Sequence, residues 1–213
     1  MDRKIIITIG RQFGSGGREI GKKLSEAFEI PYYDKELLTE ASKESGICEE
    51  VFEKADELAS NSLSYAMSMG FSYMGNFAPY SDVLSNDGLF KIQSDTIRKI
   101  AAKGSCVLVG RCADYILRDD PTMISVFIHN SKEVRIKRIV AALPVTSDQA
   151  EELMEKRDKS RASYYNYYTN KTWGASKSYD LSIDASVLGI DETVAFIKMF
   201  IEKHLQSLPP HFG

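Results

Sequence analysis

The sequence predicts an α/β fold in which a five-stranded parallel sheet lies between two layers of helices in a three-layer sandwich. Three observations support this prediction. Five short apolar segments alternate along the chain with longer segments of helical periodicity. Two of them, Cys106 to Gly110 and Met123 to His129, are mainly apolar rather than alternating, as expected of strands covered on both faces. A glycine cluster also separates the first strand from the first helix.

The first third of the chain predicts two strands that flank a glycine-rich turn and a helix. Lys4 to Ile9 is a β-branched run, and Arg18 to Phe28 has apolar residues at helical spacing. The short segment Ile30 to Tyr33 is expected to be the second strand. Residues 35–103 then show a helical pattern, interrupted at Met69 to Pro79 by two glycines and a proline.

Capping residues mark the helices that follow the strand at Met123 to His129. Asn130 and Ser131 are favourable N-cap residues for a helix from about Lys132 to Ala142. Pro144 is expected to end that helix, and a second, highly charged helix is predicted from Ser147 to about Tyr165.

The last part of the chain completes the predicted sheet. Tyr167 to Ser178 is expected to be a loop, Leu181 to Ser186 the final strand, and Asp191 to Leu205 the final helix. With 213 residues and 43% hydrophobic content, the chain can bury one sizeable core, so residues 1–213 are predicted to form a single domain.

The composition of the chain restricts its binding partners and its location. The chain has 27 Lys plus Arg against 30 Asp plus Glu, a formal net charge of −3, which argues against nucleic acid or an acidic membrane. The opening apolar run is too short for a signal peptide or a membrane span, so a cytoplasmic location is expected. Cys48, Cys106 and Cys112 lack metal-binding spacing and are interpreted as reduced, packed thiols.

The glycine-rich turn is the strongest functional signal. Gly14, Gly16 and Gly17 lie between a buried strand and a helix, where backbone N–H groups and the helix N-terminus converge. An ordinary tight turn does not need three glycines so close together. We therefore expect the turn to bind phosphate.

The stretch beginning at Ile7 resembles the P-loop of the cytidylate kinases, and further matches follow in order along the whole chain. Three positions depart from the P-loop pattern: Arg11 replaces the first glycine, Gly17 the lysine, and Glu19 the Ser/Thr that holds Mg²⁺. The resemblance implies a P-loop NTPase-type fold, ATP and Mg²⁺ as cofactors, and transfer of the γ-phosphoryl to a nucleoside monophosphate such as CMP. The departures suggest a divergent branch.

On the donor side, the resemblance implies that the loop and the start of the first helix bind the nucleotide. Arg18 could reach the phosphates in place of the missing lysine, and Glu19 could bind Mg²⁺ directly. Alternatively, both are ordinary surface residues of the helix. The residues assigned to nucleotide binding are Gly14, Ser15, Gly16, Gly17, Arg18 and Glu19.

On the acceptor side, Asp34 matches the aspartate that opens the family's DxGxxYR pattern, although the rest of that pattern is missing. Gly110 and Arg111 match the Gly-Arg of the DGRD motif, whose arginine holds the acceptor phosphate. Arg111 follows a strand end, where open α/β sheets bind ligands, but it could instead form a surface ion pair. Arg98 is a weaker candidate for acceptor binding.

Two charged segments resemble later family motifs. Ser131, Glu133, Arg135 and Arg138 are similar to the SSEERAxRR helix, and Arg135 is assigned to substrate binding. The Asp184 position is similar to the family's final-strand aspartate.

The second charged segment resembles the family's lid. Glu155, Arg157 and Asp158 are similar to the ERDxxDR motif, and Arg161 lies near its later basic position. Residues 143–178 are therefore interpreted as a lid-like region, although such charge runs are usually solvated helix faces. The residues assigned to catalysis are Arg18, Arg111, Arg157 and Arg161.

Three functions remain open from the sequence. The first is a kinase with residues 35–103 as a helical acceptor-binding insert. The second is a non-catalytic nucleotide sensor that has lost the P-loop lysine. The third is an interaction protein that uses the Met-rich aromatic stretch at residues 67–77, which could be core, a homodimer surface or a base-stacking platform.

Overall fold

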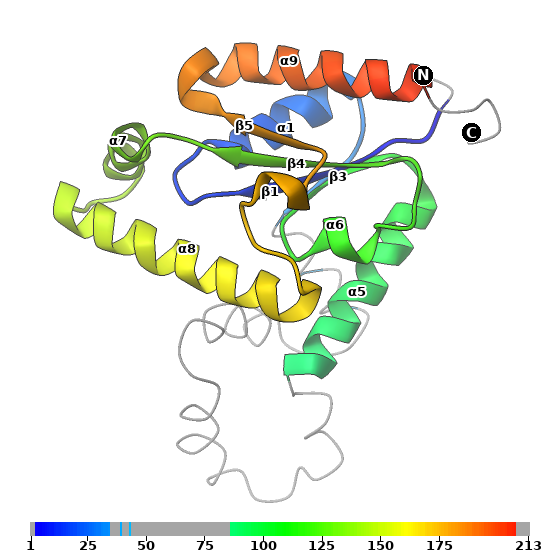
Figure 1. The fold of residues 1–213 in the computed structure, drawn as a ribbon, viewed down its shortest axis with the longest axis horizontal. Coiled ribbons are helices and arrows are strands. Elements are labelled where there is room, and N and C mark those ends of the chain that lie inside the picture. The colour runs from blue at the N-terminus through cyan, green and yellow to red at the C-terminus, as the bar shows by residue number, and fades with distance from the viewer. Residues whose placement is uncertain (1–2, 35–38, 40–42, 44–85, 208–213) are drawn as a thin grey trace, which may run out of the picture.

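The computed structural model describes residues 3–34, 39, 43 and 86–207, and every structural statement below concerns those residues. They form a parallel sheet in the order β2-β3-β1-β4-β5 (Figure 1). The strands are β1 (Ile6–Arg11), β2 (Tyr32–Tyr33), β3 (Cys106–Val109), β4 (Met123–His129) and β5 (Leu181–Asp184). The predicted five-stranded parallel sheet is confirmed.

Helices cover both faces of the sheet, as the three-layer prediction requires (Figure 1). They are α1 (Gly17–Phe28), α5 (Asn86–Lys103), α6 (Ala113–Ile116), α7 (Lys132–Ala142), α8 (Ser147–Thr169) and α9 (Ala185–Ser207), with a 3₁₀ turn η1 (Ser176–Ser178). The helices α1 and α9 lie on one face, while α5, α6 and α8 lie on the other.

The strands are apolar on both sides because alternate residues pack against different helical layers. In β1, Ile7 and Ile9 pack with α1 and α9, whereas Ile6 packs on the opposite face with α5 and α6. All three isoleucines are at most 1% exposed. Burial of such side chains contributes about 1.5 to 3 kcal/mol each, so this central strand anchors the sheet.

Aromatic and thiol groups complete the layer formed by α5, α6 and α8. The ring of Phe90 on α5 stacks on Tyr168 of α8 with 3.9 Å between centroids, and Tyr164 donates a hydrogen bond to Gln93 at 3.0 Å. Cys106 is buried, and burial raises the pKa of its thiol to about 11. Cys112 is buried as well, as predicted for packed thiols, and Cys48 lies outside the described residues.

Several predicted element limits are wrong by a few residues. The first strand begins and ends two residues later than predicted, because Gly10 and Arg11 still pair with β4. The second strand contains only Tyr32 and Tyr33. By contrast, β4 and α7 match their predicted limits, and the Ser131 hydroxyl caps α7 by accepting a hydrogen bond from the Val134 N–H.

The largest differences lie near the C-terminus. The helix α8 runs to Thr169, into the predicted loop, and ends at Asn170, which is in the left-handed conformation. The final strand ends at Asp184, because its carboxylate accepts hydrogen bonds from Ser186 and α9 begins at Ala185. Gly189, with φ 75° and ψ 178°, kinks α9, so the helix predicted from residue 191 is only its second part.

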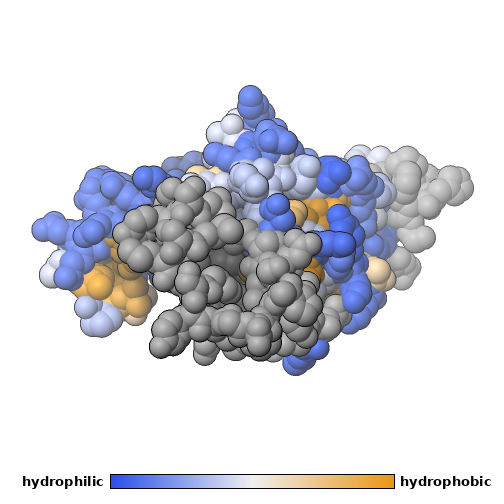
Figure 2. All heavy atoms as spheres, turned by 90° about the horizontal axis from the view of Figure 1, so that it is seen from below, coloured by the Kyte–Doolittle hydropathy of each residue, from blue (hydrophilic) through white to orange (hydrophobic). Residues whose placement is uncertain are grey.

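No helix in the described ranges combines the length and apolar character needed to cross a bilayer. On the face shown in Figure 2, the described side chains are mostly hydrophilic, and apolar groups gather only in small areas. Most of the predicted insert and the whole stretch at residues 67–77 lie outside the described residues.

Candidate functional site

The glycine-rich turn connects β1 to α1 at the carboxyl edge of the sheet. Gly14 and Gly16 have φ values of 76° and 86°, which glycine adopts without steric cost. The buried Ser15 hydroxyl donates to the Gln12 carbonyl at 2.9 Å and accepts the Gly17 N–H at 3.4 Å. The turn therefore folds back onto the N-terminus of α1, which is the local geometry of an anion-binding loop.

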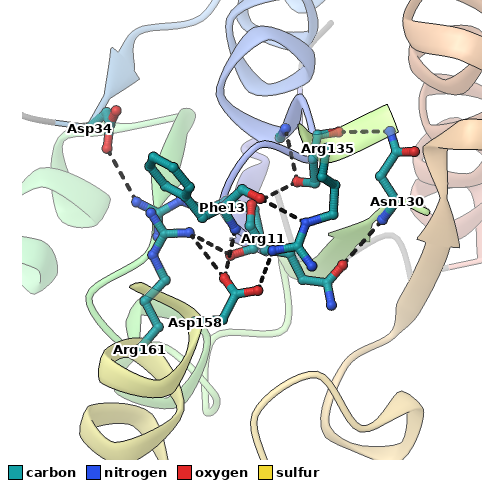
Figure 3. A network of polar contacts seen from close by, with 10 residues as sticks. Arg11, Phe13, Asp34, Asn130, Arg135, Asp158 and Arg161 are labelled. Atoms are coloured by element: carbon teal, nitrogen blue, oxygen red, sulfur yellow. Dashed lines mark hydrogen bonds and ion pairs between the residues drawn. The ribbon is translucent and has the colours of Figure 1, made fainter. Parts of the chain in front are cut away.

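Asn130, at the end of β4, supports this turn from the neighbouring strand. Its side-chain amide donates to the Ser15 carbonyl at 3.3 Å, and its backbone N–H donates to the Gln12 side chain at 3.2 Å. The sequence indicated only a helix cap at this position. Ser131 provides that cap, which leaves the buried Asn130 to hold the turn (Figure 3).

An ion pair between α7 and α8 holds the opposite side of the turn (Figure 3). The Phe13 N–H donates to an Asp158 carboxylate oxygen at 2.7 Å, and the Arg135 Nε donates to the Phe13 carbonyl at 2.8 Å. Arg135, only 6% exposed, also pairs with Asp158. The predicted substrate residue Arg135 is therefore bound to the loop and to α8 in this structure.

Arginine side chains from different elements converge beside the loop. Asp34, at the end of β2, pairs with Arg18 at 2.6 Å and with Arg11 at 3.7 Å. Arg161 of α8 donates to the Arg11 carbonyl at 3.2 Å and lies 3.9 Å from Asp158. Arg111 follows Gly110, which lies against the Arg11 guanidinium, and the charges of Arg11, Arg18 and Asp34 all affect the pKa of Arg111.

These cations destabilise one another. Burial lowers the pKa of Arg11, lowers that of Arg161 well below its usual range, and lowers that of Arg111 to about 10. In each case, neighbouring arginines lower the pKa further. We call Arg11, Arg18, Arg111 and Arg161 the arginine cluster. Asp34 and Asp158 raise the pKa values of its members, so among the described residues the four cations of the cluster lie beside these two carboxylates.

The backbone that carries Arg111 is strained. Gly110, Arg111 and Cys112 are consecutive residues with φ values of 79°, 57° and 55°. A residue other than glycine in the left-handed region costs on the order of 1 to 3 kcal/mol and tends to occur at functional sites. This strained turn places Arg111 at the carboxyl end of β3, in the crevice where open α/β sheets bind ligands.

Glu19, the predicted Mg²⁺ ligand, forms an ion pair with Arg138 of α7 at 2.6 Å. Across the described ranges, no group of three or more His, Cys, Asp or Glu residues could hold a metal ion. A single carboxylate is nevertheless compatible with Mg²⁺, which usually keeps several waters and binds nucleotide phosphates as well. Glu19 would have to leave Arg138 to act as a ligand, and its role stays a prediction.

Arg98 is a candidate that its described contacts do not bring to the cluster. Arg98 is exposed on α5 and pairs with Asp95 of the preceding turn at 3.3 Å. Arg157 is half-buried on α8, next to Asp158. Sequence reasoning also missed Arg11, which it treated only as a departure from the glycine pattern. The position of Arg11 depends on contacts between distant segments, which the sequence does not reveal. Asp158, by contrast, could be found from the sequence, because it belongs to the segment that resembles the lid motif.

Comparison with known proteins agrees with this geometry. The model of the cytidylate kinase-like family matches residues 6–187. A cytidylate kinase from Methanopyrus kandleri is 22% identical over 97% of this chain and 97% of its own length. A crystal structure of an uncharacterized protein from Eubacterium ventriosum is 34% identical, with a TM-score of 0.69, and covers 93% of this chain and 99% of that one.

A shikimate kinase from Bacteroides thetaiotaomicron shares the fold alone. It is 14% identical, with a TM-score of 0.55 over 93% of this chain and 98% of its own. The parallel sheet, the glycine-rich loop at the N-terminus of α1 and the match over residues 6–187 lead to one conclusion: this P-loop protein belongs to the cytidylate kinase-like family.

Proposed function

We propose that this protein is a kinase that transfers the γ-phosphoryl group of ATP to a small acceptor, a nucleoside monophosphate such as CMP. One observation carries the proposal: the arginine cluster gathers beside a glycine-rich loop, with two strand ends and the helix α8 contributing to it. Phosphoryl transfer requires positioning and charge stabilisation rather than a protein nucleophile, and such a cluster supplies both.

The donor phosphates would bind where the loop meets α1. The N-terminus of α1 carries a partial positive charge, and Arg18 lies in its first turn with half of its side chain exposed. Arg18 is held by Asp34 at 2.6 Å in the ligand-free protein. A phosphate group would compete with Asp34 for Arg18 and relieve the repulsion within the cluster.

The acceptor would bind at the ends of β2 and β3. Arg111 offers a guanidinium for the acceptor phosphate, and Asp34 can orient the acceptor once Arg18 turns to the donor. Arg161, and Arg157 one turn earlier on α8, would approach the transferring group from the lid-like region at residues 143–178. The name of the Methanopyrus kandleri relative supports CMP as the first acceptor to test.

Mg²⁺ would neutralise phosphate charge when bound, and Glu19, in the first turn of α1, would hold it. Its ion pair with Arg138 leaves the carboxylate 45% exposed and therefore open to exchange of partners. Glu19 itself would fix the position of the ion relative to the loop.

A second candidate function is a nucleotide sensor without catalysis. Gly17 favours it, because the P-loop lysine that normally contacts the β and γ phosphates is absent from that position. Both functions predict nucleotide binding, and only the kinase predicts phosphoryl transfer.

Radiolabelled phosphoryl transfer from ATP with Mg²⁺ tests the proposal, with CMP, the other nucleoside monophosphates and shikimate as acceptors. We expect transfer to CMP, and a loss of at least about tenfold in kcat/KM for Arg18→Ala, because a charge-assisted contact contributes about 1.5 to 3 kcal/mol. Arg118→Ala is the matched control, since Arg118 lies over the Tyr115 ring and pairs with Asp119, and its loss should leave transfer unchanged.

One result would contradict the kinase, and another would contradict only the choice of acceptor. If ATP binds but no acceptor is phosphorylated, the sensor is the function that remains. If shikimate alone is phosphorylated, the choice of a nucleoside monophosphate as acceptor is wrong. Unchanged kinetics for Arg18→Ala would remove Arg18 from the donor site. Thermal stabilisation by nucleotides should accompany all binding outcomes, by about 2.7 kcal/mol at 100 times the dissociation constant.

A further inference from the structure

Two departures from the P-loop pattern are physically linked. In the pattern G-x-x-x-x-G-K-[ST], the first glycine and the lysine lie six positions apart. This chain has Arg11 and Gly17 at those positions. A Cβ built on Gly17 would lie 2.5 Å from the Cβ of Arg11 and 3.1 Å from its Cγ. Only one of the two positions can therefore carry a side chain without displacing the loop.

The Arg11 side chain runs from the start of α1 to the acceptor edge of the sheet. Its Nη1 lies 2.2 Å from the point where a Cβ on Gly110 would stand, and its Nη2 lies 3.7 Å from Asp34. The side chain is 15% exposed, and among the described residues its buried Nε has no hydrogen-bond partner. Glycines at positions 17 and 110 thus leave room for this guanidinium between the donor loop and Arg111.

We propose that Arg11 is the cation that binds the donor phosphates in place of the P-loop lysine, reaching them from the end of β1 rather than from the start of α1. The inference rests on the proposed nucleotide site. The stem of Arg11 fills the space where a side chain at position 17 would begin. The positive charge is therefore attached at position 11 instead of position 17, but it remains beside the same loop. Arginine also offers a planar donor fork that can contact two phosphate oxygens at once.

The surroundings of Arg11 fit a ligand-binding role better than a purely structural one. Burial and the charge of Arg18 lower the pKa of Arg11. The nearest carboxylate, Asp34, pairs with both arginines but lies closer to Arg18 than to Arg11. A structural cation would be expected to have a carboxylate of its own within hydrogen-bond distance. Arg11 instead has its Nη2 within ion-pair range of Asp34 and its Nε available.

The test moves the charge back to the P-loop position. Arg11→Gly, Gly17→Lys and the double variant Arg11→Gly/Gly17→Lys are compared with wild type. Glycine is needed at position 11, because even an alanine Cβ would lie 2.5 Å from that of a lysine at position 17. Arg11→Met, which keeps an apolar stem without charge, serves as a second test if Arg11→Gly fails to fold, and Arg118→Met is the matched control.

Calorimetric titration with inorganic tripolyphosphate and with Mg²⁺-ATP measures binding, and circular dichroism checks the fold. We expect Arg11→Met and Arg11→Gly to bind both about 10- to 100-fold more weakly than wild type, as for a lost charge-assisted contact. The double variant should bind about tenfold more tightly than Arg11→Gly. Gly17→Lys alone should bind weakly and melt at a lower temperature, because two side chains then compete for one space.

Several results would overturn the inference. Unchanged binding by a folded Arg11→Met or Arg11→Gly variant would give Arg11 a structural role only. A folded double variant no tighter than Arg11→Gly, or a Gly17→Lys variant that binds more tightly than wild type at unchanged stability, would show that the two positions are not exchangeable. If wild type binds tripolyphosphate through Arg11 but transfers phosphate to no acceptor, the kinase proposal fails while this inference stands.

Discussion

Replacing Arg111 with methionine should stabilise the ligand-free protein and weaken its response to phosphates. Burial, and to a lesser extent the neighbouring cations, lower the pKa of Arg111 from its ordinary value to about 10. At about 1.4 kcal/mol per pKa unit, holding this guanidinium charged in the folded state costs about 3 kcal/mol. Methionine at the same position removes the charge but keeps an unbranched apolar stem and the left-handed backbone of the turn.

The net gain should be smaller than the full cost. Arg111 is half-buried, so solvent screens part of its charge, and lost packing of its stem offsets some of the gain. We expect the free energy of unfolding to rise on the order of 1 to 2 kcal/mol. For a chain of this size that corresponds to about 2 to 8 °C in melting temperature.

The pH dependence gives the prediction a second signature. Arg111 is protonated in both states at pH 7, and its folded pKa is the lower of the two. The unfolded state therefore binds more protons between about pH 10 and 12.5, and the cost of the buried charge fades as pH rises through that window. The advantage of Arg111→Met should be constant from about pH 7 to 9 and shrink above about pH 10.

Differential scanning calorimetry in phosphate-free buffer measures the effect, with and without inorganic tripolyphosphate. The variant should melt higher alone but gain less from tripolyphosphate than wild type does. Arg118→Met, whose side chain is 46% exposed, should change the stability by less than about 0.5 kcal/mol. A loss of more than about 1 kcal/mol for Arg111→Met, or an unchanged response to tripolyphosphate, would refute the reasoning.

Three further predictions concern the support of the loop. Asp158→Asn should lower the free energy of unfolding by about 3 kcal/mol in urea denaturation, because it leaves the buried Arg135 without its carboxylate; a loss below about 1 kcal/mol would contradict this. Gly110→Ala should cost only about 1 kcal/mol in stability but weaken tripolyphosphate binding, since the new Cβ displaces the Arg11 guanidinium; equal calorimetric affinity would contradict that placement. Ser131→Ala should cost about 1 kcal/mol through the lost cap of α7, with phosphate binding unaffected, and a larger effect on binding than on melting would be inconsistent with a capping role.

The sequence predicted the sheet well where burial and capping act locally. The limits of β4 and α7 were correct because a mainly apolar run is followed by Asn130 and Ser131, two residue types that favour the N-cap position of a helix. The start of α9 was missed because Ala185 to Leu188 continue an apolar pattern, and only the φ of Gly189 reveals a kink within one helix. Local pattern alone cannot separate these alternatives.

The sequence predicted which residues form the candidate site better than it predicted which residues they contact. Arg18, Asp34, Arg111 and Arg161 were all singled out, and the structure brings them together. Their catalytic and binding roles stay predictions. The position of Arg11 could not be inferred, because the contact that explains it joins the end of β1 to the start of α1 across the loop.

The loop is fastened from β4, α7 and α8, and this has a thermodynamic consequence for any ligand that binds it. Asn130, Arg135 and Asp158 fix its carbonyl and amide groups through contacts made within the folded chain. The conformational entropy of ordering this segment is therefore lost at folding and not at binding. An arriving anion would meet donors already in place, so its association should show only a small unfavourable entropy of ordering.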